Sequence, residues 1–216
     1  MSRIAVIGGH GKVALHLTRI LAEQGHQVSS FFRNPAHIDD VAATGAEPVV
    51  ADVEKLSSEE IAELLTGHHG VVWSAGAGGG DPERTYAVDR DAAIRSMDAA
   101  GQAGAKRFVM VSYFGAGPDH GVPEGEGFFH YAEAKAAADA YLRDTALDWT
   151  ILGPSGLTDE PGTGRIETGE GVTGGTVPRE DVARVAAAVL GEPTTAGRTI
   201  EFNGGDTPID EVVSPL

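Results

Sequence analysis

The chain has 216 residues, of which 32 are acidic and 16 are basic, so its formal net charge at pH 7 is −16. This length suits one domain with its own core, and the negative charge disfavours general binding to nucleic acids because it repels their phosphates. Cysteine is absent, which excludes disulfide scaffolds and thiolate metal sites, and no run of about 18 apolar residues occurs, so we expect a cytoplasmic protein without a membrane span.

Short apolar runs alternate with longer segments in which apolar residues recur every three to four positions, the patterns of strands and helices. Strands are predicted at residues 4–7, 26–32, 47–51, 70–74, 107–112, 148–152 and 199–202. Helices are predicted at residues 13–24, 35–43, 58–65, 82–103, 131–145 and 177–190. This alternation predicts an α/β fold over residues 1–216, a doubly wound parallel sheet of Rossmann-like type with helices on both faces.

Two stretches rich in glycine and proline, residues 115–127 and 158–175, each follow a predicted strand. Ligands of doubly wound sheets bind beyond the carboxyl ends of the strands, so both stretches are candidate lids or substrate loops. We place the C-terminal substrate loops at about residues 153–176. A disordered linker is the alternative interpretation of each stretch.

The first predicted strand and helix are joined by a glycine-rich turn, Gly8-Gly9-His10-Gly11-Lys12-Val13. Gly8 can make the tight turn, and Gly11 lets a pyrophosphate approach the free amides and the positive dipole end of the helix. Ala14 fills the third small position of the motif. At this junction the turn predicts a dinucleotide site, and a purely structural glycine turn is the alternative.

The residues after the second strand indicate which dinucleotide binds. An acidic residue there would take the adenosine ribose hydroxyls and select NAD, but this chain has Arg33 followed by Asn34. The planar guanidinium could hold a 2′-phosphate, so NADP is preferred and NAD is the less favoured cofactor. A solvated arginine at a strand end is the alternative.

Two further strand ends contribute candidate cofactor contacts. Asp52 and Val53 follow the third strand, and the carboxylate could either accept from the adenine amino group or cap the next helix. Ser74, Ala75 and Gly76 follow the fourth strand, where small residues let a cofactor lie against the backbone.

A candidate proton-transfer set follows in the second half of the chain. Ser112 ends the fifth strand, and Tyr131 and Lys135 lie four residues apart at the start of the next predicted helix, on one face. A lysine ammonium beside a tyrosine hydroxyl lowers the pKa of the phenol, which suits a general acid/base for carbonyl–alcohol chemistry. Ser112 could donate to the substrate oxygen, and Lys135 could also hold the nicotinamide ribose. An exposed helical Tyr–Lys pair is the alternative.

At this point the chain resembles the short-chain dehydrogenase/reductase superfamily, and more narrowly its atypical NAD(P)-binding members, labelled NAD-dependent epimerase/dehydratase or NmrA-like. The resemblance covers nearly the whole chain. It is carried by the glycine turn, Phe32-Arg33-Asn34-Pro35, Asp52-Val53, residues 109–112, Tyr131 with Ala134-Lys135, and the segments 148–152, 157–162 and 179–183. It implies a Rossmann-like sheet, a nicotinamide cofactor and a catalytic set at Ser112, Tyr131 and Lys135.

The chain departs from the family pattern after the sixth strand. Gly153-Pro154 stands where the family commonly has Arg-Pro, which puts in doubt any anion contact made there. Pro154 and Ser155 could still contact the carboxamide end of the cofactor. Ala14 in place of the third glycine is a mild change.

The eight histidines give no metal-ligand spacing together with carboxylates, so no metal site is expected. His68 and His69 precede the fourth strand and are interpreted as a turn pair. His120 and His130 flank the first loop, and His130, next to Tyr131, could assist a substrate or be a plain loop histidine.

We therefore expect an NADP(H)-dependent oxidoreductase that acts on a small carbonyl or quinone-like molecule. A non-catalytic NAD(P)-sensing regulatory or interaction protein is the alternative, favoured by Gly153 and by the short segment after Ile151. An NAD-dependent sugar epimerase or dehydratase ranks third, because that segment leaves little room for a large substrate domain. The partner is a small-molecule substrate, and both a monomer and a homodimer are open.

Overall fold

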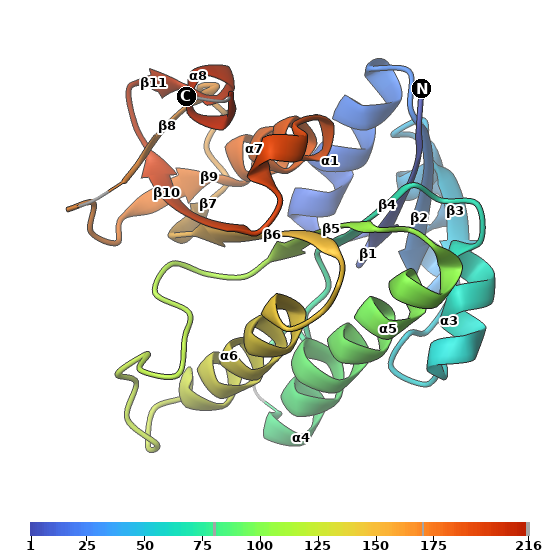
Figure 1. Ribbon diagram of the computed structural model, residues 1–216, viewed down its shortest axis with the longest axis horizontal. Coiled ribbons are helices and arrows are strands. Elements are labelled where there is room, and N and C mark those ends of the chain that lie inside the picture. Colours follow the sequence, from blue (N-terminus) through green and yellow to red (C-terminus); the bar gives the residue numbers. More distant parts are fainter. Residues whose placement is uncertain (80, 170, 215–216) are drawn as a thin grey trace.

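A computed structural model of the chain describes residues 1–79, 81–169 and 171–214. Its centre is a nine-stranded sheet in the order β11-β8-β10-β6-β5-β4-β1-β2-β3, with helices on both faces (Figure 1). Seven of these strands form a continuous parallel run, and their bounds are β3 (Glu47–Val50), β2 (Gln27–Phe32), β1 (Arg3–Ile7), β4 (Gly70–Trp73), β5 (Arg107–Val111), β6 (Asp148–Pro154) and β10 (Arg198–Gly204).

This order confirms the predicted doubly wound sheet. The chain leaves β1 in one direction toward β2 and β3 and returns past β1 to β4, so the crevice of the sheet opens beyond the carboxyl ends of β1 and β4. Every carboxyl end of the parallel run lies at the same edge, which brings the loops that follow these strands together.

Short strands at the C-terminal end of the sheet were not predicted. β8 (Arg165–Thr168) pairs antiparallel with β10, and β11 (Thr207–Pro208) pairs antiparallel with β8. A separate two-stranded ladder joins β7 (Gly156–Thr158) to β9 (Thr176–Pro178). The stretch 158–175 therefore contains a strand of the main sheet, although its Glu170 lies outside the described residues.

The helices form two layers, whose members are seen above and below the sheet in Figure 1. One layer holds α1 (Lys12–Glu23), α7 (Arg179–Gly191) and α8 (Ile209–Val213). The other layer holds α3 (Ser58–Leu65), α4 (Pro82–Thr85), α5 (Ala93–Ala103) and α6 (Phe129–Arg143), while α2 (Ile38–Ala42) follows a 3₁₀ turn, η1 (Pro35–His37), between β2 and β3. The predicted helix 82–103 is interrupted by one π-helical segment, Tyr86–Ala92.

Each face of the sheet has its own apolar core because successive strand residues point to opposite sides. In β1, Ile4 and Val6 pack toward α1 and α7, whereas Ala5 and Ile7 pack toward α3 and α5. The strands thus carry apolar residues on both faces, which is the composition of a parallel sheet covered on both sides. No helix in the described ranges is long and apolar enough to cross a membrane.

The two predicted loops are held to the fold by specific bonds. In the second, the amides of Thr163 and Gly164 each donate to the Asp181 carboxylate of α7 at 2.8 Å. In the first, His120 Nε2 lies 2.7 Å from Glu133 Oε1 of α6. These contacts give both stretches defined positions, so neither is described as a disordered linker.

Candidate functional site

The glycine turn between β1 and α1 is shaped by close backbone contact with the end of β4. Gly8 has φ of +90°, and a Cβ added there would lie 2.5 Å from the Cα and the amide nitrogen of Ala75. A Cβ at Gly9 would lie 2.0 Å from Ser30 Oγ of β2. Both positions therefore favour glycine, because a side chain at Gly8 would overlap the backbone after β4 and one at Gly9 would overlap Ser30 within β2.

Gly11 precedes the first residue of α1 and gives that helix no side-chain cap. The first amides of an α-helix have no partner within the helix, and they carry the positive end of its dipole. The first turn of α1 thus presents uncapped N–H groups at the sheet edge, an arrangement that suits a phosphate or pyrophosphate.

A cavity of about 750 Å³ opens in front of this turn, beyond the carboxyl ends of β1, β2, β3 and β4. A nicotinamide dinucleotide suits such a space, because the first amides of α1, next to the glycines in its wall, have no side-chain cap. Ten of the predicted cofactor residues line it: Gly8, His10, Gly11, Arg33, Asn34, Asp52, Val53, Ser74, Ala75 and Gly76.

Other predicted cofactor residues lie elsewhere. Gly9 is turned toward Ser30, and the Val13 side chain is buried in the core between α1 and the sheet. Lys12 Nζ forms an ion pair of 2.5 Å with Asp159, which also pairs with Arg179 at 2.7 Å. The segment that follows β7 is therefore tied to the first turn of α1 by an exposed ion pair.

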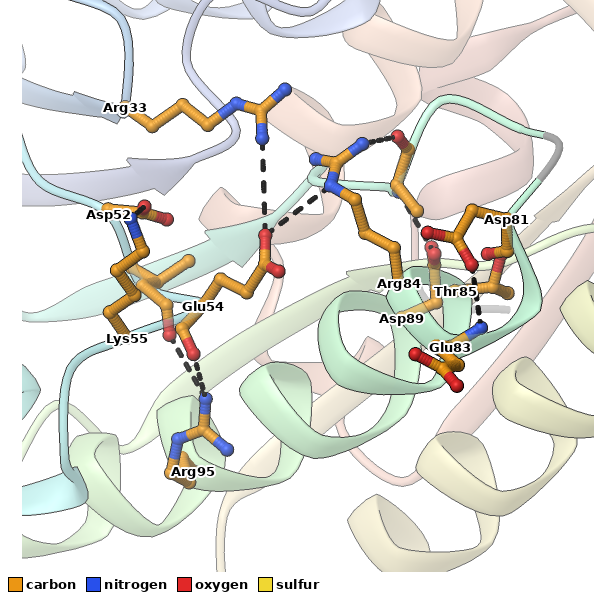
Figure 2. A network of polar contacts seen from close by, with 12 residues as sticks. Arg33, Asp52, Glu54, Lys55, Asp81, Glu83, Arg84, Thr85, Asp89 and Arg95 are labelled. Atoms are coloured by element: carbon orange, nitrogen blue, oxygen red, sulfur yellow. Dashed lines mark hydrogen bonds and ion pairs between the residues drawn. The ribbon is translucent and has the colours of Figure 1, made fainter.

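A network of charged side chains missed by the sequence interpretation crosses the wall of the cavity (Figure 2). Glu54 Oε2 lies 4.0 Å from Arg33 Nη1 and 3.4 Å from Arg84 Nε. These residues follow three different strands, because Arg33 comes after β2, Glu54 after β3 and Arg84 after β4, on α4. Glu54 could have been proposed from its place after a strand end, but the position of Arg84 depends on how α4 folds back.

Arg95 of α5 fixes the loop that carries Glu54. Its guanidinium donates to the carbonyl oxygens of Val53, Glu54 and Leu56 at 3.0–3.2 Å. Asp52 pairs with Lys55 at 3.2 Å, and α3 is capped instead by Ser57, whose hydroxyl accepts from the Glu60 amide. The helix-capping alternative for Asp52 is therefore wrong, and a contact with adenine stays a prediction.

The loop after β4 is held through Ala77, whose amide and carbonyl groups both bond to side chains of the following helix. The Ala77 amide donates to Asp89 Oδ2 at 3.0 Å, and the Ala77 carbonyl accepts from the Arg84 guanidinium. Asp89 lies in the π-helical segment and is 1% exposed. The small residues that line the cavity are thus positioned by side chains of the following helix.

A second, mainly apolar cavity of about 420 Å³ lies beyond β5 and β6. It is lined by four predicted site residues, Ser112, Tyr131, Pro154 and Ser155, and by Tyr113, Phe114, Phe128, Gly156, Leu157, Gly174 and Gly175. Two buried hydroxyl groups in this wall, Tyr113 Oη and Ser155 Oγ, have no hydrogen-bond partner within the described part of the chain.

A third cavity, of about 300 Å³, shares wall residues with each of the other two. It shares Gly76 with the dinucleotide-sized cavity, and it shares Phe128 and Tyr131 with the apolar one. Tyr131 therefore stands between the two smaller spaces. His130, beside it, lies in α6 with its Nδ1 3.2 Å from Tyr86 Oη, so it is not a loop histidine.

Below Tyr131, the structure buries a cluster of charges. Lys135 is 1% exposed, and its Nζ donates to the Val111 carbonyl at 2.9 Å and contacts Met110 Sδ at 3.0 Å. Burial lowers the pKa of Lys135, opposed by the charges of Asp139 and Asp89. Burial also raises the pKa of both carboxyl groups. Lys135 does not line the dinucleotide-sized cavity.

The expected effect of Lys135 on Tyr131 is not what the structure shows. Burial raises the pKa of the Tyr131 phenol, and the nearby charges of Asp89 and Asp139 raise it further. The ammonium is directed at the Val111 carbonyl, and the two carboxylates near it offset its charge. The sequence indicated the spacing of the pair correctly but not these two acidic neighbours.

Packing against neighbouring residues explains why position 153 is a glycine. A Cβ at this position would lie 2.9 Å from Glu201 Cγ and 3.2 Å from the Tyr113 carbonyl oxygen. Glu201 Oε1 in turn accepts from the Gly115 amide at 2.7 Å. The space that an arginine would enter is therefore occupied by a side chain of β10 that holds the start of the 115–127 loop.

Comparisons with known proteins agree with this geometry. A sequence model of the NAD(P)H-binding family matches residues 8–193. A Bacillus subtilis protein named uncharacterized sugar epimerase YhfK is 35% identical over 99% of this chain and 100% of its own length. A provisionally named NAD-dependent epimerase/dehydratase from Bacillus halodurans is 33% identical, with a TM-score of 0.91 and full coverage of both chains. The oxidoreductase ylbE from Lactococcus lactis is 29% identical, with a TM-score of 0.87 over 98% of this chain and 94% of that one.

Proposed function

Because the chain belongs to the NAD(P)H-binding family, we propose that it is an NADP(H)-dependent oxidoreductase of the atypical short-chain dehydrogenase/reductase type, acting on a small carbonyl or quinone-like compound. The observation that carries the proposal is the position of Tyr131. It borders the apolar cavity and the third cavity, and the third cavity shares Gly76 as a wall residue with the dinucleotide-sized cavity. A substrate in the apolar space would thus have a proton donor on one side and the cofactor site close by.

The preference for NADP over NAD rests on the two arginines at the adenosine end. Arg33 and Arg84 both approach Glu54, whose single negative charge is their partner in this network. A 2′-phosphate carries more charge and more acceptor oxygens than a carboxylate, and it matches the planar donors of a guanidinium. NADP would therefore displace Glu54 from Arg33, whereas NAD brings no group that does so.

Tyr131 would act as the proton donor in the direction of reduction. Its raised pKa keeps the phenol protonated at neutral pH. When bound, a reduced nicotinamide supplies a hydride to the carbonyl carbon. Tyr131 would transfer its proton to the carbonyl oxygen, which gives the alcohol, and would recover a proton from water.

Lys135 and Asp139 would position the end of β5. Lys135 bonds the Val111 carbonyl, and Asp139 Oδ2 accepts from Ser112 Oγ at 2.5 Å, so both side chains of α6 hold consecutive residues of that strand end. A contact between Lys135 and the nicotinamide ribose would require Lys135 to release Val111. A donation from Ser112 to substrate would likewise require its hydroxyl to leave Asp139.

The test starts with calorimetric titration by NADPH and, separately, NADH. Tighter binding of NADPH is expected, followed by NADPH oxidation with members of a panel of small aldehydes, ketones and quinones. Tyr131→Phe should then lose at least about a hundredfold in turnover with the affinity for NADPH kept. Tyr141→Phe is the matched control, because Tyr141 lies on the same helix, with its hydroxyl bonded to Asp98 at the surface. Full turnover by Tyr131→Phe would overturn the assignment.

A non-catalytic cofactor-sensing protein is the second candidate. The bond between Ser112 and Asp139 favours it, because the serine hydroxyl is engaged inside the protein and not offered to a ligand. This candidate predicts NADPH binding without oxidation across the whole panel. If neither dinucleotide binds, both candidates fall.

A further inference from the structure

Two histidines and one aspartate meet at the rim of the dinucleotide-sized cavity. His10 belongs to the glycine turn, His37 to η1 and Asp40 to α2. His10 Nε2 lies 3.0 Å from Asp40 Oδ2, and His37 Nδ1 lies 3.8 Å from the same oxygen. The three candidate ligand atoms all lie within 4.8 Å of one another. The sequence concealed this set, because the first histidine is far from the other two residues along the chain.

The imidazole rings of His10 and His37 are stacked face to face. Their centroids are 3.5 Å apart and their planes differ by 10°. The Asn34 side chain supports this arrangement, because its oxygen accepts from the Ala36 amide at 3.1 Å while its nitrogen lies 3.2 Å from His37 Nε2. Because the Asn34 amide nitrogen is a donor, His37 Nε2 accepts from it and Nδ1 carries the ring proton toward Asp40. An ion bound at Nδ1 would replace that proton, and the Asn34 side chain would have to rotate away from Nε2.

The donor set has the chemistry of a transition-metal site. Two imidazole nitrogens and one carboxylate oxygen suit Zn²⁺, Ni²⁺ or Cu²⁺, whereas Mg²⁺ and Ca²⁺ prefer oxygen ligands. Ligands at about 2.0–2.2 Å from a tetrahedral ion are themselves roughly 3.3 Å apart, close to the spacings seen here. About one third of each histidine side chain is exposed, and Asp40 is 63% exposed, so an ion can enter. Because each imidazole binds a metal in its own plane, binding by both would require the rings to rotate out of their stack.

We propose that His10, His37 and Asp40 form a binding site for a divalent transition-metal ion such as Zn²⁺. Three protein ligands leave a fourth coordination position for water or another ligand. His10 and His37 also line the cavity, so the ion would lie at its wall. This site goes beyond the proposed reductase function and does not depend on it.

The experiment is a calorimetric titration of the chain with ZnCl₂ at neutral pH, without any dinucleotide. One saturable site is expected. His10→Ala, His37→Ala and Asp40→Asn should each weaken Zn²⁺ binding at least about tenfold. His26→Ala is the matched control, because this half-buried histidine lies at the opposite end of the sheet, next to Ser2, and it should leave the affinity unchanged.

A second readout does not depend on the variants. Co²⁺ added to the unmodified chain should give the visible absorption bands of a low-symmetry site with nitrogen ligands, and Zn²⁺ should abolish them. The proposal is overturned if no saturable Zn²⁺ binding occurs, or if the His10→Ala/His37→Ala double variant binds Zn²⁺ as tightly as the His26→Ala variant. Because the readouts are metal binding and absorption, a failed search for a reductase substrate leaves the result interpretable.

Discussion

The Ser112 hydroxyl donates a 2.5 Å hydrogen bond to the Asp139 carboxylate, one helical turn beyond Lys135 on α6. Asp139 is fully buried and is also close enough to Lys135 to oppose the fall of the lysine pKa. Ser112, Lys135 and Asp139 thus form one buried unit. The Asp139 carboxylate accepts a hydrogen bond from Ser112 and attracts the Lys135 ammonium through its charge. With Asp89 the unit contains two carboxyl groups and one ammonium.

Lys135→Met removes the buried cation of this unit, and the other cations near its carboxyl groups, Arg84 and Arg143, are not buried. The two carboxyl groups then remain buried without a buried counterion, and we expect the free energy of unfolding to fall by roughly 3–5 kcal/mol at neutral pH. Denaturant unfolding measures the change. The exposed Lys106→Met is the control and should change stability by less than about 0.5 kcal/mol.

The same variant should show a characteristic pH dependence. A carboxyl group whose folded pKa is raised contributes stability below its unfolded pKa, and this contribution is lost as the pH rises through the folded pKa. Burial raises the pKa of Asp89 and Asp139 already, and loss of the ammonium raises it further. The deficit of Lys135→Met should therefore shrink as the pH falls toward 4 and grow toward neutrality. A deficit independent of pH would contradict the charge argument.

Glu54→Gln should raise the affinity for NADPH by about three- to tenfold, because it removes the carboxylate that competes with a 2′-phosphate for Arg33 and Arg84. NADH affinity should change less than twofold. Arg33→Ala should do the reverse, weakening NADPH about tenfold or more and sparing NADH. Calorimetric titration of each variant with NADPH and with NADH gives four affinities, each compared with that of the unmodified chain. If a variant changed the affinities for NADPH and NADH equally, the 2′-phosphate would bind away from Arg33 and Glu54.

The pH profile of carbonyl reduction should report the raised pKa of Tyr131. A proton donor is effective below its pKa, so kcat/KM should remain level until above pH 10, the ordinary value for tyrosine. Tyr131→Phe should remove this alkaline limb from any residual activity. A fall centred near neutral pH would mean that the phenol is acidified in the working enzyme, as its spacing from Lys135 first suggested.

Gly8→Ala tests the close approach of the glycine turn to β4. Gly25 provides a matched control, since both glycines have positive φ, but a Cβ at Gly25 meets nothing within 4 Å. Gly25→Ala should cost about 1 kcal/mol from backbone strain alone. Gly8→Ala should cost at least about 2 kcal/mol more, because its Cβ would overlap the Ala75 backbone, and it should also weaken dinucleotide binding. Similar losses in the two variants would show that strain alone accounts for both.

The regular part of the fold was predictable because its signals are local. The central strands β1, β4 and β5 carry continuous apolar stretches, as in residues 108–111, and each long helix has its own periodicity. The strands β8 and β11 escaped prediction because they are four and two residues long, and in β8 only Ile166 is buried. An apolar pattern of two to four residues looks the same in a strand and in a loop.

The candidate site was predictable where its residues follow strand ends. Arg33, Asp52 and Gly76 could be placed on this ground alone, since the sheet topology brings strand ends to one edge. Arg84 and Asp89 could not, because their directions depend on α4 and on the π-helical segment after it. Asp139 was within reach, because it lies four residues after Lys135 on one helix and so shares its face.

The contact between Gly153 and Glu201 limits how this chain can change. Arginine cannot be introduced at position 153 unless Glu201 first withdraws, and Glu201 holds the amide of Gly115. Arginine at position 153 would thus come with a loosened 115–127 loop, or would need a prior substitution at Glu201. The present glycine is therefore entrenched by a partner on another strand, and a family-wide rule drawn from the sixth strand alone would misjudge which replacements this chain tolerates.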